Sequence, residues 1–276
     1  MENSLKDRVM VVNVHISLWG ARKQDDKVKR EIEDIHNVRE VGSFTKKLMK
    51  SPHLEEINTK AGRIRKIYRE MTLPWGDNGD RIITTDKYFE FLTTLGKETM
   101  EFDQLCDNFA YKVYVDQIEK ERERLKTMFR ESDYPHPDLI RDKFRLKTVF
   151  SPLTDGNDFR LAASDEINAI LKAQMEHELK NRVETANAEI LDKVRVVVMK
   201  MYETLSEPGK GFKSSLIGNV EALVDTIPTI NIFNDTHITE VVEMLKPLCV
   251  NYDVLKGNDS FRQEIAKKAF NVLQNM

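Results

Sequence analysis

The chain has 276 residues, of which 40% are hydrophobic and 32% are charged, and its net charge at pH 7 is −3. This balance is typical of a helix-rich soluble protein, and it excludes a disordered chain and a protein whose overall charge attracts nucleic acid. No apolar run reaches the ~18 residues that a membrane span needs, and nothing resembles a secretion signal. We therefore expect a cytoplasmic protein whose two cysteines, Cys106 and Cys249, are unpaired.

The first seventy residues are predicted to form one strand and two helices. Apolar and polar residues alternate over 8–18, which is the pattern of a half-buried strand. Residues 21–42 carry a few spaced apolar side chains that indicate a short amphipathic helix. A clearer helix begins at Ser51-Pro52, because serine caps a helix and proline suits its first turn, and it ends at Leu73-Pro74.

An apolar stripe in strict heptad spacing is the strongest structural signal in the sequence. Its members are Tyr88, Leu92, Leu95, Thr99, Phe102, Cys106, Phe109 and Val113. The stripe predicts a coiled-coil-like helix over about 86–130, roughly 66 Å long. Beyond Val113 the heptad fails and Glu119–Lys126 is nearly all charged. We expect this end of the helix to leave its partner and project into solvent.

A second long helix is predicted over 165–206, with a mean apolar step of about 3.8 residues. We expect it to fold back antiparallel to the first, across a hairpin of strands 145–150 and 159–162 around an Asp-Gly turn. Shorter helices are expected at the C-terminus, over 212–227, 236–248 and 260–274.

The predicted fold is mainly α: two long, antiparallel, coiled-coil-like helices with a small β-sheet of about three strands and a C-terminal helical set. Residues 1–210 would hold the sheet and the long pair. Residues 211–276 would form a helical subdomain packed on it.

Several short motifs together resemble a family of uncharacterised helical proteins from bacteriophages and bacteria, catalogued as a domain of unknown function. The matching stretches are Trp19-Gly20-Ala21-Arg22-Lys23, Leu73-Pro74-Trp75-Gly76-Asp77, Tyr88-Phe89, Asp133-Tyr134-Pro135, Asp158-Phe159-Arg160-Leu161, Phe212-Lys213-Ser214-Ser215-Leu216, Leu223-Val224 and Ile227-Pro228-Thr229-Ile230-Asn231-Ile232. They span nearly the whole chain in order. The resemblance implies a phage or prophage protein, with MoxR-like AAA ATPases as neighbours and possible partners, but it implies no agreed activity.

Two loops carry residues that are typical of ligand sites, and in both we favour a plain turn. The loop over 77–80 is acidic, but its Gly79 is misplaced for a calcium loop. Gly209-Lys210-Gly211 lacks the spacing of a phosphate loop and is preceded by a helix rather than a strand. The six histidines show no metal-ligand spacing, and no nucleophile-elbow motif occurs. We therefore expect no catalytic residues, no metal, no cofactor and a protein that is not an enzyme.

Trp75 and two basic clusters are the candidate binding residues. Trp75 is either a hydrophobic plug at a helix corner or an exposed anchor for a protein partner. The first basic cluster, on the helix after Pro52, consists of Lys60, Arg63, Arg65, Lys66 and Arg69. The second consists of Arg122, Arg124, Lys126 and Arg130, followed by Arg141, Lys143, Arg145 and Lys147.

Each basic cluster has two interpretations. Its cations could bind phosphates of nucleic acid, with neighbouring aromatics such as Phe129 stacking on bases. Alternatively the interspersed glutamates pair with them on a solvated helix face, which we favour. Our leading hypothesis is a homo-oligomeric, non-enzymatic interaction or scaffold protein. Its partner surface would include Trp75 and, at the charged helix end, Arg122, Arg124, Lys126, Phe129 and Arg130. A protein that handles phage DNA through both clusters is the alternative.

Overall fold

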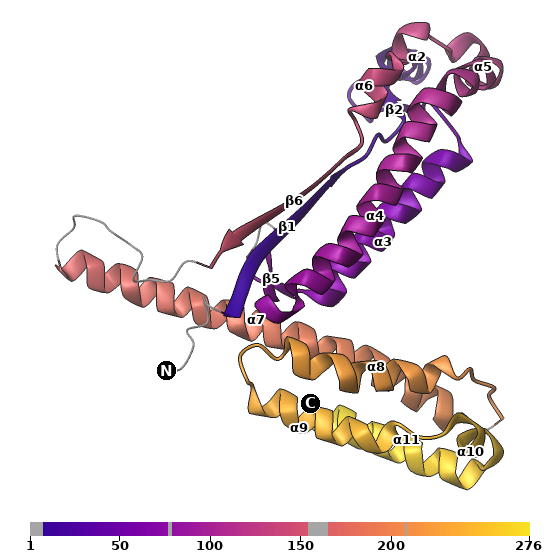
Figure 1. The fold of residues 1–276 in the computed structure, drawn as a ribbon. Helices are drawn as coiled ribbons and strands as arrows, with labels where there is room; N and C mark the ends of the chain where they lie inside the picture. The colour runs from indigo at the N-terminus through magenta and orange to yellow at the C-terminus, as the bar shows by residue number, and fades with distance from the viewer. Residues whose placement is uncertain (1–7, 77–78, 154–164, 208) are drawn as a thin grey trace. The chain divides into compact units, whose positions relative to one another are not determined.

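The computed structural model describes residues 8–76, 79–153, 165–207 and 209–276, and over these ranges the protein is mainly helical with a small antiparallel sheet (Figure 1). The chain divides into two compact units. Unit 1 comprises 1–13, 70–89 and 150–276, and unit 2 comprises 14–69 and 90–149. The helices at 215–274 therefore share a unit with the helix at 165–206, whereas the sequence suggested a boundary near 210. They do so because they cover its apolar face.

The sheet has the strand order β4-β5-β1-β6. Its strands are β1 (Val9–Ser17), β4 (Leu73–Pro74), β5 (Arg81–Thr84) and β6 (Arg145–Pro152). In the antiparallel pairing of β1 with β5, Val9 lies opposite Thr84 and Val12 lies opposite Arg81. The predicted strands at 8–18 and 145–150 are confirmed, whereas the one at 159–162 lies outside the described residues. β4 and β5 are too short to carry an alternating sequence pattern, so the sequence did not reveal them.

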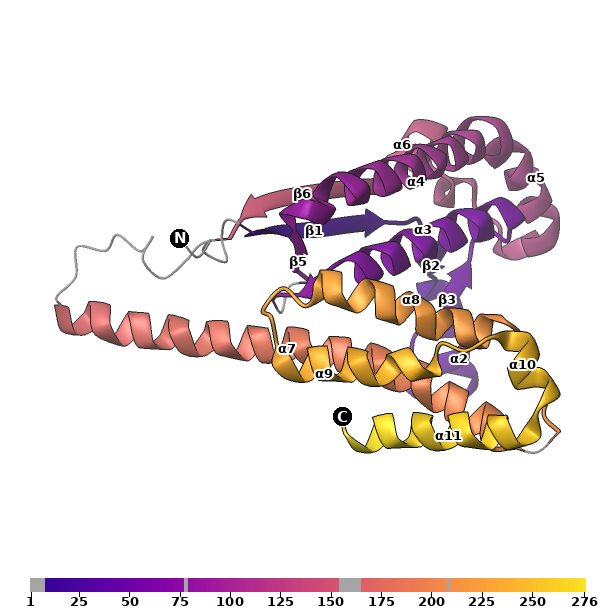
Figure 2. The same cartoon turned by 60° about the horizontal axis from the view of Figure 1, so that its bottom comes forward.

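Unit 1 is organised around α7 (Asp165–Ser206), which begins and ends where the sequence predicts. Three helices pack along its C-terminal half, namely α8 (Ser215–Ile230), α9 (Thr236–Leu245) and α11 (Asp259–Gln274), and the short α10 (Tyr252–Gly257) precedes α11. One continuous hydrophobic core joins them to β4 and β5, and on α7 it is formed by Ala186, Ile190, Val194, Val198, Met201 and Leu205. Figure 2 shows α7 running on beyond the ends of α8, α9 and α11.

Unit 2 contains α3 (Pro52–Met71) and α4 (Tyr88–Asn108), which lie side by side (Figure 1). A π-helical turn (Phe109–Val113) joins α4 to α5 (Tyr114–Leu125), so the predicted long helix is continuous as far as Leu125. The strands β2 (Arg22–Gln24) and β3 (Thr45–Lys47) pair antiparallel, and α2 (Asp26–Ile35) lies between them in the sequence. The short α6 (Pro137–Arg141) completes the unit.

The two long helices have shorter partners within their own units. Lys60 and Arg63 of α3 contact Glu98 of α4, and Tyr68 contacts Phe91, so α3 and α4 run antiparallel. In unit 1, α11 runs antiparallel to α7, since Arg262 bonds the carbonyl of Thr204 while Phe270 packs on Tyr202. The predicted pairing of 86–130 with 165–206 is thus not confirmed, because each helix already buries its apolar face against these neighbours.

Candidate functional site

The charged helix end at 119–130 contacts the segment 47–50 of unit 2 through Glu121 and Arg124, while most of its other side chains are exposed. Gln117 and Glu121 are both buried. Glu121 accepts a hydrogen bond from the backbone N–H of Lys50 at 2.7 Å and pairs with Arg124. Arg124 also donates to the carbonyl oxygen of Lys47 at 2.8 Å. Two charges of the helix end, those of Glu121 and Arg124, therefore serve a structural contact.

The first basic cluster is held by acidic side chains of α4. Lys60 pairs with Glu98 at 2.8 Å and with Glu101, and Arg63 pairs with Glu98 at 3.0 Å. Burial lowers the pKa of Lys60, but its two carboxylate partners outweigh burial and leave the pKa above its ordinary value. The remaining members lie at the surface of α3, where Arg65 is half-buried and where Lys66 and Arg69 also interact with neighbouring groups.

The second basic cluster is likewise interleaved with acids. Arg122 pairs with Glu119 at 3.2 Å, and its guanidinium lies 4.5 Å from the ring centre of Phe129. Phe129 stacks on Tyr134, so this ring is packed and not presented to a base. Arg141 pairs with Asp103 at 2.9 Å and also with Asp107.

The other members of the second cluster are scattered. Arg130 lies 3.5 Å from Asp25, and Arg145 donates to the carbonyl oxygen of Asp142. Lys126, Lys143 and Lys147 are exposed. Neither cluster presents cations without acids among them, so the geometry favours the solvated-face interpretation over phosphate binding.

Trp75 belongs to the core of unit 1. It is 5% exposed and stacks on Phe233, with ring centres 6.3 Å apart. The guanidinium of Arg182 lies 5.8 Å from its ring centre. This burial favours the hydrophobic-plug interpretation of Trp75 over the exposed anchor for a partner.

A buried ionic cluster ties together three segments of unit 2. The Lys46 ammonium donates to Asp133 Oδ2 at 2.7 Å and to the carbonyl oxygen of Met128 at 2.9 Å, and it lies 3.4 Å from Asp25 Oδ2. Lys23 pairs with the other oxygen of Asp133 at 2.7 Å. Asp25 also caps α2 by accepting from the backbone N–H groups that begin the helix.

The carboxyl groups of this cluster stay ionised. Burial raises the pKa of Asp25, but the backbone N–H of Val28 and the charges of Arg130 and Lys46 outweigh burial and hold the pKa below its ordinary value. Lys23 and Lys46 do the same for the pKa of Asp133. The two carboxyl groups are therefore ionised at neutral pH and cannot donate a proton.

Unit 1 contains a comparable ionic contact between the sheet and α7. Arg81 on β5 donates to the hydroxyl of Thr72 at 2.6 Å and to its carbonyl oxygen at 2.7 Å, and it pairs with Glu189 on α7 at 2.5 Å. Burial raises the pKa of Glu189, but Arg81 and Lys193 bring it below its ordinary value. This contact anchors α7 to the sheet.

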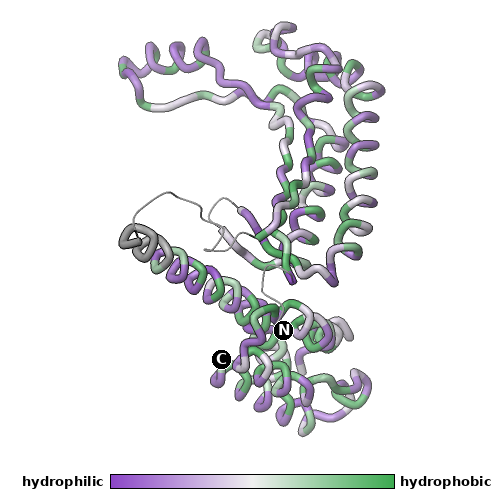
Figure 3. The backbone as a smooth tube through the Cα atoms, turned by 60° about the vertical axis from the view of Figure 1, so that its left-hand side comes forward, coloured by the Kyte–Doolittle hydropathy of each residue, from purple (hydrophilic) through white to green (hydrophobic). Residues whose placement is uncertain are grey.

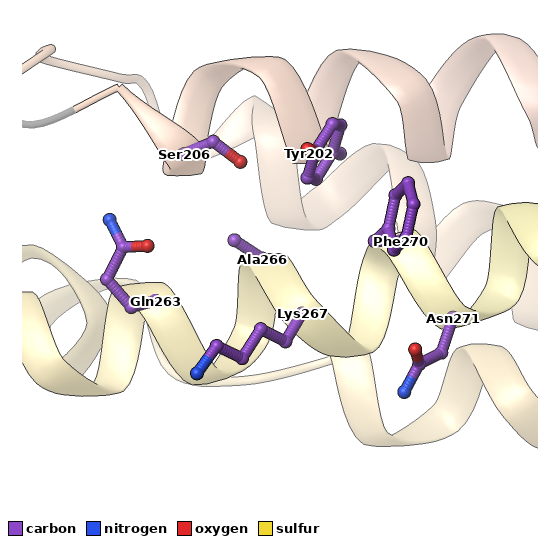
Figure 4. Close-up of a pocket in the computed structure, with 7 residues that line it drawn as sticks. All are labelled: Tyr202, Ser206, Gln263, Ala266, Lys267, Phe270 and Asn271. Carbon is purple, nitrogen blue, oxygen red and sulfur yellow. The ribbon is translucent and has the colours of Figure 1, made fainter.

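The turn after α7 and the hollow beside it hold no catalytic arrangement. Gly209 has φ of 74°, the Lys210 side chain pairs with Glu207, and the carbonyl of Lys210 accepts from Arg262, so the predicted helix-ending turn is confirmed. A cavity of about 430 Å³ lies between α7 and α11 (Figure 4). The cavity is lined by Tyr202, Ser206, Gln263, Ala266, Lys267, Phe270 and Asn271, and Lys267 is the one charged residue among them. A hollow without a carboxylate, histidine or cysteine lacks the paired groups that acid–base or nucleophilic catalysis needs.

Other features of the described residues add no chemistry. Over 8–76, 79–153, 165–207 and 209–276, no three His, Cys, Asp or Glu residues gather closely enough to hold a metal ion. Within these same ranges, no helix has both the length and the apolar character to cross a bilayer. The predicted turn at 77–80 includes Asp77 and Asn78, which lie outside the described residues. Burial raises the pKa of the Cys106 thiol to about 12, which makes it a poor nucleophile.

A further candidate surface is the part of α7 that extends past its partner helices. We call residues 173–185 the α7 arm. Ala186 is fully buried, yet one and two turns earlier on the same line Val183 is half-buried and Leu179 is 42% exposed. Apart from the half-buried Met175, residues 173–181 are all exposed. Figure 3 shows hydrophobic positions recurring along this part of α7.

The arm was not among the candidate sites predicted from the sequence. Its apolar steps of four, four and three, from Met175 through Leu179 and Val183 to Ala186, were visible in the sequence. They were assigned to pairing with the first long helix, and only the structure shows that this line continues beyond the core.

No protein-family model, curated protein or solved structure matches this chain.

Proposed function

We propose that the protein works through protein contacts, as a non-enzymatic interaction or scaffold protein, and that the α7 arm carries those contacts. The observation behind this proposal is the line of apolar side chains that is buried at Ala186 and emerges into solvent at Leu179. A helix with an uncovered apolar line gains free energy when another helix covers it. The coiled-coil character predicted from the sequence belongs to this proposal, as packing formed by the arm with a partner.

The resemblance to a bacteriophage and bacterial family extends the proposal to the setting. It supports a phage-encoded protein in a bacterial cytoplasm, with a MoxR-like AAA ATPase as one partner to test. The alternative of DNA handling is less well supported, because acidic side chains are paired with members of both basic clusters.

Capture of partners by matched variants tests the proposal. Leu179→Glu places a charge on the apolar line of the arm. Val196→Glu, the control, places one on another face of α7, where Val196 is 71% exposed. Because both sites are exposed, both variants should keep the circular dichroism spectrum and thermal midpoint of the parent.

We expect Leu179→Glu to lose bound protein, either a second copy or another chain, that the parent and Val196→Glu retain. Equal amounts of the same bound proteins on all three baits, after extraction from cells that make the protein, would refute a role for the arm.

A further inference from the structure

The α7 arm carries charges in an order that suits one occupant, a second copy of the same helix running in the opposite direction. We propose that two copies associate by crossing their arms antiparallel at Leu179. This inference rests on the proposed function and names the partner surface for it. In such a crossing the two Leu179 side chains face each other. Met175 of each copy then lies beside Val183 of the other.

The charged residues on the two flanks of the apolar line indicate in which relative direction the two helices pair. Glu176 and Lys180 lie on one flank and Glu178 and Arg182 on the other, so that each flank carries an acid followed four residues later by a base. Glu176, Glu178 and Lys180 are exposed, and Arg182 is half-buried. In an antiparallel pair, the same flank of each helix faces its counterpart.

Antiparallel crossing therefore brings two opposite-charge contacts together on each side, against one like-charge contact on each side, Lys180 with Lys180 and Glu178 with Glu178. Glu176 of one copy comes next to Lys180 of the second copy, and Glu178 comes next to Arg182 of the second copy. Parallel pairing would bring unlike flanks together, with Glu176 beside Glu178 and Lys180 beside Arg182, so that these like-charge contacts outnumber the opposite-charge contact of Glu178 with Lys180. The charge order thus favours antiparallel pairing and opposes parallel pairing.

The arm's existing ion pairs do not prevent this arrangement. Glu178 pairs with Arg182 at 2.9 Å and Lys180 with Glu184 at 3.9 Å, both within the helix and exposed to solvent. Exposed pairs of this kind contribute little and exchange partners readily. The apolar contact from Met175 to Ala186 covers about three turns, or roughly 17 Å. A contact of this length buries less area than the ~1,600 Å² of a standard interface. We therefore expect a weak dimer whose population rises with protein concentration.

Site-specific cross-linking tests the direction. In a Cys249→Ala background, with the buried Cys106 retained, a short bis-maleimide should link Leu179→Cys to itself. It should also link Met175→Cys to Val183→Cys when the two variants are mixed. Asn181→Cys, on the opposite face of the arm, is the control and should remain monomeric. Links of Met175→Cys to itself and of Val183→Cys to itself, without the mixed product, would overturn the antiparallel arrangement.

Charge reversal gives an independent measurement. Glu176→Lys alone and Lys180→Glu alone each place like charges together twice per dimer. Each should weaken self-association by about threefold to tenfold in sedimentation equilibrium at low salt. An equal mixture of the two variants should recover the affinity of the parent, because only the mixed dimer restores opposite charges. Failure of the mixture to recover would overturn the pairing.

The outcomes separate this inference from the function on which it rests. A parent protein that stays monomeric at every concentration overturns the self-pairing. If Leu179→Glu nevertheless loses a captured protein, the proposed function stands and the occupant is a different chain. If the thiol of Leu179→Cys reacts with a maleimide at low micromolar concentration as slowly as the buried Cys106, the arm is covered within a single chain, and the self-pairing is overturned.

Discussion

Replacing Lys46 with methionine tests whether the buried ionic cluster stabilises unit 2. The Lys46 ammonium has three acceptors, on Asp133, Met128 and Asp25, and its side chain is 3% exposed. Removing one partner of a buried ion pair costs about 3–5 kcal/mol, because the opposite charge stays buried. Lys23 and Arg130 remain on the two carboxylates, but their side chains are about half exposed. We therefore expect the lower end of that range, about 3 kcal/mol.

The two tryptophans allow the effect to be assigned to one unit. Trp19 lies in unit 2 against Phe109 and Tyr114, whereas Trp75 lies in the core of unit 1. In a Trp75→Phe background, Lys46→Met should shift the urea transition reported by Trp19 fluorescence. In a Trp19→Phe background it should leave the transition reported by Trp75 nearly unchanged. Lys47→Met, at the adjacent exposed position, is the control. A loss of under about 1 kcal/mol would show that the cluster is not a stabilising contact.

The pH dependence of the same variant has a defined sign. The pKa values of Asp25 and Asp133 are lowered in the folded protein, so their stabilising effect is present above the unfolded pKa of about 3.9. It is lost as the pH falls through the folded pKa. Without Lys46 the pKa values of Asp25 and Asp133 are lowered less, so the difference in the free energy of unfolding between variant and parent should become smaller below about pH 4. A difference that is constant from pH 7 to about pH 3 would contradict the electrostatic explanation.

Three further predictions concern the other sites. Arg81→Leu should lower the free energy of unfolding reported by Trp75 by about 2–3 kcal/mol, because Glu189 and Thr72 lose a buried partner. The control Arg195→Leu, at an exposed position, should lower it by under about 0.5 kcal/mol, and equal effects of the two variants would contradict this explanation. Cys106 should react with a thiol reagent far more slowly than the half-buried Cys249 until the protein unfolds, since burial raises its pKa to about 12; equal rates in the native protein would be inconsistent with its burial. Duplex and single-stranded DNA should not bind at about 50 mM salt in a fluorescence anisotropy titration, and salt-dependent binding through both basic clusters would instead support the DNA-handling alternative.

Local signals predicted the elements that are long or clearly bounded. Helix α3 starts at the proline that follows Ser51, and α7 spans the predicted 165–206, because capping residues and apolar periodicity act within a few turns. The strands β4 and β5, of two and four residues, were missed because β5 depends on pairing with β1, and β4 on pairing with β5, and not on their own pattern. The apolar residues that suggested a helix, Ile32, Ile35 and Val38, are all exposed, Val38 lies beyond the end of α2, and the buried residue of α2 is Glu33. Glu33 accepts from the backbone N–H of Glu40, a contact that no periodicity foretells.

The candidate sites were harder to predict, because exposure depends on what packs nearby. Trp75 has the same appearance in sequence whether it is a plug or an anchor, and only the position of Phe233 decides between them. The arm shows the reverse case. Leu179 and Ile190 belong to one apolar series, yet Ile190 is fully buried and Leu179 is 42% exposed, because the helices that cover α7 end between them.

At the charged end of the first long helix, one extra residue in the backbone shifts the heptad pattern and changes which residues are buried. The heptad stripe, continued past Val113, places Asp116 and Lys120 on the buried face, and their charge suggested that the helix leaves its partner. The π-helical turn over Phe109–Val113 inserts one extra residue into the helix. Every later position moves by one, so that Tyr114, Gln117 and Glu121 are the buried residues. Glu121 then meets the backbone N–H of Lys50 and the guanidinium of Arg124, which satisfy its charge. The helix thus remains in contact with the segment 47–50 because its buried face changes register at the π-helical turn.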